Sequence, residues 1–243
     1  KFGNVWQYHS RSDRHSKVGC WGVAFDLLAT SALLRKHAEA GKVVVGVNHK
    51  MMNHLTQSEK ALDLVIARPS SSLLPVGESL RELVSRFEVP LDATQSQLLS
   101  SLPDIPIGDV GAVLVALEAK AVMTAHTAAR PRLYDELNSS QLAVHGSSSQ
   151  ALAIGFVKVN ASSTFVSSDR NKFSLKHNPE VVNLHTQPHA YLGVLEKVNM
   201  LPRRVGTTGV GFDGLGAVIL DFDNRGGPVG VGTAPPAPQP RDP

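Results

Sequence analysis

Hydrophobic and polar positions along the chain follow two different periods, and their order predicts an α/β fold. Apolar residues recur at helical spacing from Trp21 to Ala32, and Gly41 follows as a helix stop, so we expect a helix over residues 17–40. Residues 1–15 are polar and basic and are expected to form a loosely held arm. The stretches that follow the helix are β-branched and bounded by Gly or Pro, which favours strands.

The expected core alternates these elements as helix, three strands, helix and strand. Pro69 marks the end of the second strand, and Pro131 and Gly146 mark the start and stop of the second helix. The fourth strand is apolar enough to be central in the sheet. In chain order the pattern predicts a helix over 17–40, strands over 42–50, 60–69 and 112–120, a helix over 130–146 and a strand over 150–162.

Additions to this core are also visible. Residues 70–111 alternate helical periodicity with prolines, so we expect an insertion between the second and third strands that carries one or two short helices. Beyond the core, residues 161–232 form a C-terminal elaboration with one expected helix and one expected strand. Residues 233–243 are rich in proline and lack the apolar side chains of a core, which is typical of a disordered tail. We therefore expect one domain over residues 1–232.

Composition narrows the class of protein. The chain has 243 residues, 42% hydrophobic and 19% charged, which is ordinary for a globular domain. Its net charge is +3 and its pI is about 9.1, so a polyanionic partner is permitted but not required. Cys20 is the single cysteine, which excludes an internal disulfide and suits a reducing cytoplasm. No apolar run reaches the length of a membrane span, and we see no secretory signal.

Three charged residues fall inside apolar strands, where an uncompensated charge is costly. Glu118 and Lys120 are two positions apart in the third strand, so their side chains share a face. Asp63 lies near the start of the second strand. If the two strands are antiparallel, the start of one lies beside the end of the other, so both acids and the lysine are expected close together on one face at the sheet end. Two carboxylates can hold Mg²⁺, which lowers the pKa of a bound water and polarises a phosphate.

The order of elements and the Glu118-Ala119-Lys120 motif resemble the PD-(D/E)XK nuclease superfamily, whose members have the restriction-endonuclease-like fold. The likeness covers roughly residues 17–160, as order and pattern; Leu62 stands where the motif name has Pro. It implies a Mg²⁺-dependent deoxyribonuclease of type II restriction kind, with Mn²⁺ as an alternative metal. It also implies double-stranded DNA as substrate and a cytoplasmic homodimer. Asp63, Glu118 and the Ala119 carbonyl would bind the metal, and Lys120 would position the attacking water.

Other interpretations stay open. Asp104 and Asp109 are alternative partners for Glu118, and Asp104 follows a literal Pro. The Glu118–Lys120 pair could also be an incidental surface ion pair of an unrelated α/β protein, or the fold could bind nucleic acid without catalysis. Basic side chains around the motif are candidates for contact with nucleic acid: Arg130, Arg132 and Lys158.

Overall fold

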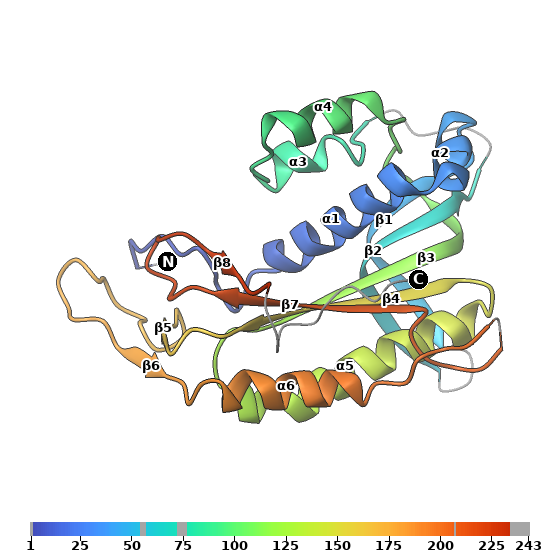
Figure 1. The fold of residues 1–243 in the computed structure, drawn as a ribbon. Helices are drawn as coiled ribbons and strands as arrows, with labels where there is room; N and C mark the ends of the chain where they lie inside the picture. The colour runs from blue at the N-terminus through green and yellow to red at the C-terminus, as the bar shows by residue number, and fades with distance from the viewer. Residues whose placement is uncertain (1, 54–56, 72–76, 207, 234–243) are drawn as a thin grey trace.

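The computed structural model describes residues 2–53, 57–71, 77–206 and 208–233, which form six helices and eight strands (Figure 1). The helices are α1 (Arg14–Thr30), α2 (Ala32–Glu39), α3 (Leu83–Arg86), α4 (Ala93–Ser101), α5 (His126–Ser147) and α6 (His189–Asn199). The strands are β1 (Val44–Asn53), β2 (Ser58–Pro69), β3 (Val110–Val122), β4 (Leu152–Asn160), β5 (Thr164–Val166), β6 (Val182–Leu184), β7 (Gly214–Asp221) and β8 (Gly230–Val231).

Six of the strands form one mixed central sheet in the order β1-β2-β3-β4-β7-β8. β1, β2 and β3 pair antiparallel. The connection from β1 to β2 is short, whereas the insertion with α3 and α4 joins β2 to β3. Helical crossovers through α5 and α6 make β4 parallel to β3 and β7 parallel to β4. The α/β class, the order of the core elements and the central position of the fourth strand are therefore confirmed.

Helices cover both faces of the sheet. α1 lies on one face with the short helices α3 and α4 above it, and α5 and α6 lie on the other (Figure 1). Trp21, Leu28, Ile66 and Leu117 belong to the core on the α1 face. Val65, Leu137, Val157 and Val194 belong to the core on the α5 face. Burial on both faces explains why the inner strands are almost continuously apolar.

The prediction of one continuous helix over residues 17–40 is wrong, because the structure has two helices there. The two halves, α1 and α2, meet at 94°. Ser31 is the N-cap of the second half, with its side chain accepting a hydrogen bond from the backbone N–H of Leu34 at 3.2 Å. A Ser side chain competes well for backbone N–H groups at such a position, so it begins a new helix there.

Helix α5 begins earlier than its sequence indicated. It starts at His126 rather than at residue 130, so Pro131 lies inside the helix and not at its start. The helix also runs through Gly146, the expected stop, to Ser147. The insertion over 70–111 carries two short helices, α3 and α4, as expected.

The N-terminal arm is not loosely held. Its backbone is bonded to Asn224, whose side-chain oxygen accepts from the N–H of Tyr8 at 2.8 Å. Asn4 donates to the carbonyl of Phe173 at 2.7 Å. The arm therefore packs on the C-terminal elaboration. Strands β5, β6 and β8 in that elaboration were not expected, because they have only two or three residues each.

No single helix in the described ranges has both the length and the apolar character needed to cross a membrane. α1 and α2 reach that length and composition only together, across their sharp bend. The Pro-rich tail expected over 233–243 lies outside the described residues from 234 onward.

Candidate functional site

The three charged residues of the motif lie where the sheet opens between β2 and β3. The ladder between these strands begins at the pair Leu64 and Leu117. Asp63 and Glu118 come directly outside this pair, one from each strand. Beyond them β2 continues beside β1 as far as Ser58, while β3 continues beside β4 as far as Val122. The antiparallel neighbours expected from the sequence are thus present, and their charged residues flank the point of separation.

Asp63 occupies this opening with both carboxylate oxygens bonded. Oδ2 accepts a hydrogen bond from the backbone N–H of Ala119 at 2.9 Å, a donor at the edge of β3. Oδ1 lies 2.6 Å from the Nζ atom of Lys17 and 3.0 Å from the Oγ atom of Ser16, both on α1. Burial pushes the pKa of Asp63 upward, but the Lys17 bond and charge and the Ala119 N–H outweigh it and lower that pKa.

Glu118 is the most constrained acid of the group. Its side chain is buried, with 3% of the residue exposed, and among the described residues its Oε2 atom has no hydrogen-bond partner. Burial raises the pKa of Glu118; the Lys120 ammonium opposes this rise, and the charge of Asp63 adds to it. A buried carboxylate oxygen without a partner is costly, so this atom is available to a cation.

Lys120 connects β3 to α5. Its Nζ atom lies 2.7 Å from Oε1 of Glu118 and 3.3 Å from Oε2 of Glu136. Glu136 in turn accepts from the Nε atom of Arg132 at 2.5 Å, one helical turn away. Burial tends to lower the pKa of Lys120, but the two glutamates outweigh it and raise that pKa. The ammonium therefore stays protonated at neutral pH.

The expectation that both acids and the lysine share one face of the sheet is wrong, because the contacts of the two strands run to opposite faces. Asp63 is bonded to α1 and Lys120 to α5, and these helices lie on opposite faces (Figure 1). The carboxylate of Asp63 reaches between them because it is bonded to the backbone of β3. The result is a row of charged side chains through the opening, in which ion pairs on either side flank two neighbouring acids, Asp63 and Glu118. The row consists of Lys17, Asp63, Glu118, Lys120, Glu136 and Arg132.

This row suits a hard cation by its chemistry but only in part by its arrangement. Carboxylate oxygens are the ligands that Mg²⁺ prefers, and Glu118 supplies one without a partner. Asp63 already shares its charge with Lys17. Within the described ranges, no three His, Cys, Asp or Glu side chains are grouped so that they could hold one metal ion. Asp63 and Glu118 are the two acids of the row that flank the opening between β2 and β3.

The alternative acids lie elsewhere. Asp104 belongs to the connection between α4 and β3, where its Oδ1 atom accepts from the backbone N–H groups of Arg81 and Ile105. Asp109 directly precedes β3 at the end far from Glu118, and its carbonyl accepts from Ser70. The geometry brings Asp63, and neither of these two, to Glu118.

The three basic candidates occupy different environments. Arg132 is exposed and pairs with Glu136. Arg130 packs against α6, where a side-chain carbon added at Gly193 would meet its guanidinium at 2.1 Å. Lys158 is largely enclosed, and its Nζ atom donates to the carbonyl of His15 at the start of α1. Burial lowers the pKa of Lys158 to about 8.

Sequence reasoning missed the partners that complete the row, namely Ser16, Lys17 and Glu136. A signal for Lys17 was available, because it shares a helical face with Trp21, Ala24 and Leu28, all of them buried. A lysine on a buried helical face needs an acid opposite it. For Glu136 there was no comparable signal, since it lies on a mostly polar stretch of α5.

A scan against protein-family models found no match to this chain, and searches of curated proteins and of solved structures found none either.

Proposed function

We propose that this chain is a divalent-metal-dependent endonuclease that hydrolyses phosphodiester bonds of DNA, built on a PD-(D/E)XK core. The observation that carries the proposal is the placement of Asp63 and Glu118 on adjacent strands, directly outside the last pair of the β2–β3 ladder. The unpartnered, buried Oε2 atom of Glu118 supports it, because such an atom is retained at a cost to stability.

In this proposal Asp63 and Glu118 hold Mg²⁺, with the Ala119 carbonyl as a further ligand. The bound cation supplies Lewis acidity: it lowers the pKa of a water and polarises the phosphate. It also offsets the repulsion between two close carboxylates. A cation at this site would compete with Lys17 for the carboxylate of Asp63.

Lys120 acts as a cation and not as a base. Glu118 and Glu136 raise its pKa, so its ammonium keeps its proton at neutral pH. It therefore orients the attacking water as a hydrogen-bond donor and stabilises the negative charge that develops on the phosphate. During hydrolysis the water oxygen bonds to phosphorus, the bond to one sugar oxygen breaks, and that oxygen takes up a proton.

The test is cleavage of supercoiled plasmid with Mg²⁺, with Mn²⁺ and with EDTA. We expect nicking or cutting with metal only. We expect Asp63→Asn, Glu118→Gln and Lys120→Gln each to lose about 100-fold or more in rate, because each removes charge from the transition state. Glu39→Gln and Lys36→Gln, both on α2, are matched controls that keep the wild-type rate.

Undiminished cleavage by Glu118→Gln would contradict the proposal. Duplex cleavage also calls for two sites acting on opposite strands, so we expect a homodimer, which the molar mass in solution with and without DNA measures.

A second candidate is a nucleic-acid-binding module with the same core and no catalysis. The buried Lys17–Asp63 ion pair favours it, because Lys17 already compensates the carboxylate that a metal would need. Tight binding of DNA together with no cleavage at any enzyme excess, in either metal, would support this candidate instead.

A further inference from the structure

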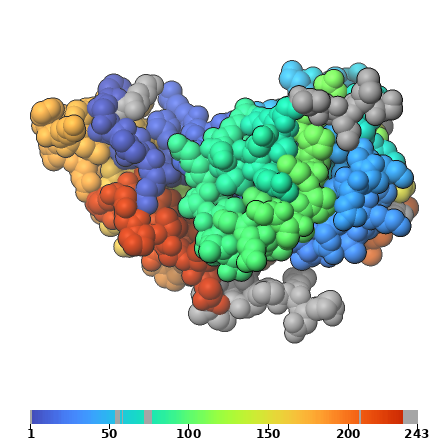
Figure 2. Space-filling view, turned by 90° about the horizontal axis from the view of Figure 1, so that it is seen from above, coloured from blue at the N-terminus to red at the C-terminus, as the bar shows by residue number. Residues whose placement is uncertain are grey.

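A second feature of the α1 face lies beside the charged row: a hollow of about 420 Å³ lined by segments far apart in the sequence. The N-terminal arm supplies Trp6 and Tyr8, the start of α1 supplies His15, the insertion supplies residues 88–90, and β4 supplies Lys158. Val229 of the C-terminal segment also lines it. Figure 2 shows the arm, the insertion and the C-terminal segment side by side on this face. Clefts that bind small organic molecules have volumes of roughly 300–1,000 Å³.

The hollow has an aromatic wall. Tyr8 is fixed there, since its ring lies 4.6 Å from the His15 ring and 6.3 Å from the Phe165 ring. Trp6 is half-buried, lines this hollow and is not among the ring pairs of the described residues. Nucleobases stack on such side chains whatever their identity.

The hollow is also positively charged. Lys158 lines it and, within the described ranges, has no carboxylate within ion-pair distance. The acid among the lining residues is Glu88, which Arg14 already binds at 3.3 Å. An enclosed ammonium with only a backbone carbonyl as partner gains from an anion in the hollow. Its pKa of about 8 leaves Lys158 mainly protonated at neutral pH.

The hollow adjoins the proposed metal site. His15 is followed directly by Ser16 and Lys17, the two residues that bind Asp63. A chain whose phosphate lies at Lys158 is thus led along the start of α1 toward the opening between β2 and β3.

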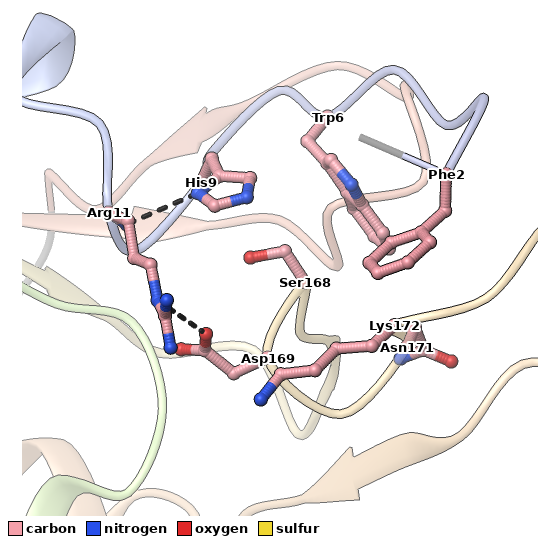
Figure 3. A pocket seen from close by; sticks show the side chains of 8 residues that line it. All are labelled: Phe2, Trp6, His9, Arg11, Ser168, Asp169, Asn171 and Lys172. Atoms are coloured by element: carbon pink, nitrogen blue, oxygen red, sulfur yellow. Dashed lines mark hydrogen bonds and ion pairs between the residues drawn. The ribbon is translucent and has the colours of Figure 1, made fainter.

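A smaller hollow lies on the other side of Trp6 and is a poorer candidate. Its volume is about 110 Å³, well below the range for a nucleotide. Figure 3 shows Trp6 and Phe2 facing Lys172 there, while the carboxylate of Asp169 is bonded to Arg11. Asp169 would also repel a phosphate.

We propose that the larger hollow binds one unpaired nucleotide of a nucleic-acid strand, with its base on Trp6 and its phosphate at Lys158. This inference deepens the proposed function, because it names the form of substrate next to the metal site. A base held in a duplex cannot stack on Trp6, so the nucleotide belongs to a single-stranded segment.

The experiment measures binding in EDTA, so that no cleavage occurs. Trp6 and Trp21 are the two tryptophans, and Trp21 is buried with its Nε1 atom bonded to the carbonyl of Leu80. Quenching of tryptophan fluorescence by an eight-nucleotide oligothymidylate therefore reports on Trp6. Thymidine monophosphate distinguishes capture of a free nucleotide from capture of a strand, and a fully paired duplex of the same length tests for an unpaired base.

We expect the oligonucleotide to quench and the duplex to bind without quenching. Trp6→Ala and Lys158→Met should each weaken oligonucleotide binding by about tenfold, in anisotropy with a labelled strand. Lys172→Gln removes one exposed positive charge on the other side of Trp6 and should change binding by less than about twofold. Trp6 lies on the arm, so its variant tests the site even if Lys158→Met fails to fold.

Wild-type affinity in Trp6→Ala, equal losses in Lys172→Gln and Lys158→Met, or equal quenching by the duplex would each overturn the inference. Its failure differs from failure of the nuclease proposal. If strand binding depends on Trp6 but plasmid is not cleaved, the nucleotide-binding proposal stands and the nuclease proposal fails. If plasmid cleavage depends on Glu118 but Trp6→Ala has no effect, the nuclease proposal stands and the nucleotide-binding proposal fails.

Discussion

At the scale of single residues, the two acids of the candidate site differ in how many hydrogen-bond and ion-pair partners offset their charge. Asp63 has three donors, from Lys17, Ser16 and the Ala119 backbone. Glu118 has Lys120 on one oxygen and no partner on the other. The pKa of Asp63 is lowered and that of Glu118 is raised, so the two carboxyl groups titrate apart. Acids whose pKa values are pushed apart by their surroundings are candidates for a functional site.

Glu118→Gln should stabilise the fold at neutral pH. The folded-state pKa of Glu118 is raised, so the folded protein binds more protons than the unfolded chain, and stability falls as the pH rises from the ordinary glutamate value through the folded one. Glutamine cannot ionise, so the variant does not lose this stability as the pH rises. Lys120 still has its ion pair with Glu136 in the variant. We expect a melting temperature higher by a few degrees at pH 7, at about 2–4 °C per kcal/mol, and little difference at pH 4.

Thermal melts at both pH values, with and without Mg²⁺, provide the measurement. Mg²⁺ should raise the melting temperature of the wild type more than that of the variant. A less stable variant at pH 7 would show that Glu118 is a structural ion-pair partner.

At the scale of elements, the opening between β2 and β3 depends on how the strands are joined at the other end. The ladder there is irregular, with register shifts between Ile66 and Ala67 and between Arg68 and Pro69. Gly111 lies against this bend, where a side-chain carbon would meet the carbonyl oxygen of Pro69 at 2.8 Å and the Cα atom of Ser70 at 3.0 Å. The close backbone approach requires glycine at this position.

Gly111→Ala should therefore destabilise the protein by about 1–3 kcal/mol, because backbone atoms must shift to admit the methyl group. Urea denaturation measures the loss. Gly227→Ala is the matched control, since no heavy atom lies within 4 Å of the added carbon. Equal stability of the two variants would mean that the β2–β3 connection yields easily and does not fix the register.

At the scale of the whole molecule, the N-terminal arm and the C-terminal elaboration form one unit around Asn224. This residue is 3% exposed and has φ of 67°, a left-handed conformation that Asn tolerates better than most residues. Its side chain accepts from the N–H of Tyr8 and donates to the carbonyls of Tyr8 and Val166. Asn224 thus ties the arm to β5, and the arm in turn forms a wall of the proposed nucleotide hollow.

Asn224→Ala should cost about 1–3 kcal/mol, because buried backbone groups lose their partners. It should also free the arm, so that trypsin cleaves sooner at Arg11 and oligothymidylate binding weakens along with it. Asn178→Ala, an exposed site whose side chain bonds only locally, is the control. Unchanged proteolysis in Asn224→Ala would show that other contacts hold the arm.

The order of the core elements was readable from the sequence, because hydrophobic period is local and the inner strands are buried on both faces. The sequence also identified Asp63, Glu118 and Lys120 as charges out of place in apolar strands. It missed the bend at Ser31 and the early start of α5, because capping and a tolerated internal Pro131 depend on backbone geometry that periodicity does not encode.

By itself, the sequence determined the α/β class, the order of the core and the three charges that interrupt its strands, since each follows from residues close together in the chain. Only the tertiary structure decided which acid meets Glu118, that Lys17 and Glu136 compensate the pair from opposite faces, and that the arm closes a hollow beside Lys158. These depend on where β2 and β3 separate and on contacts between segments far apart in sequence, which no local pattern records.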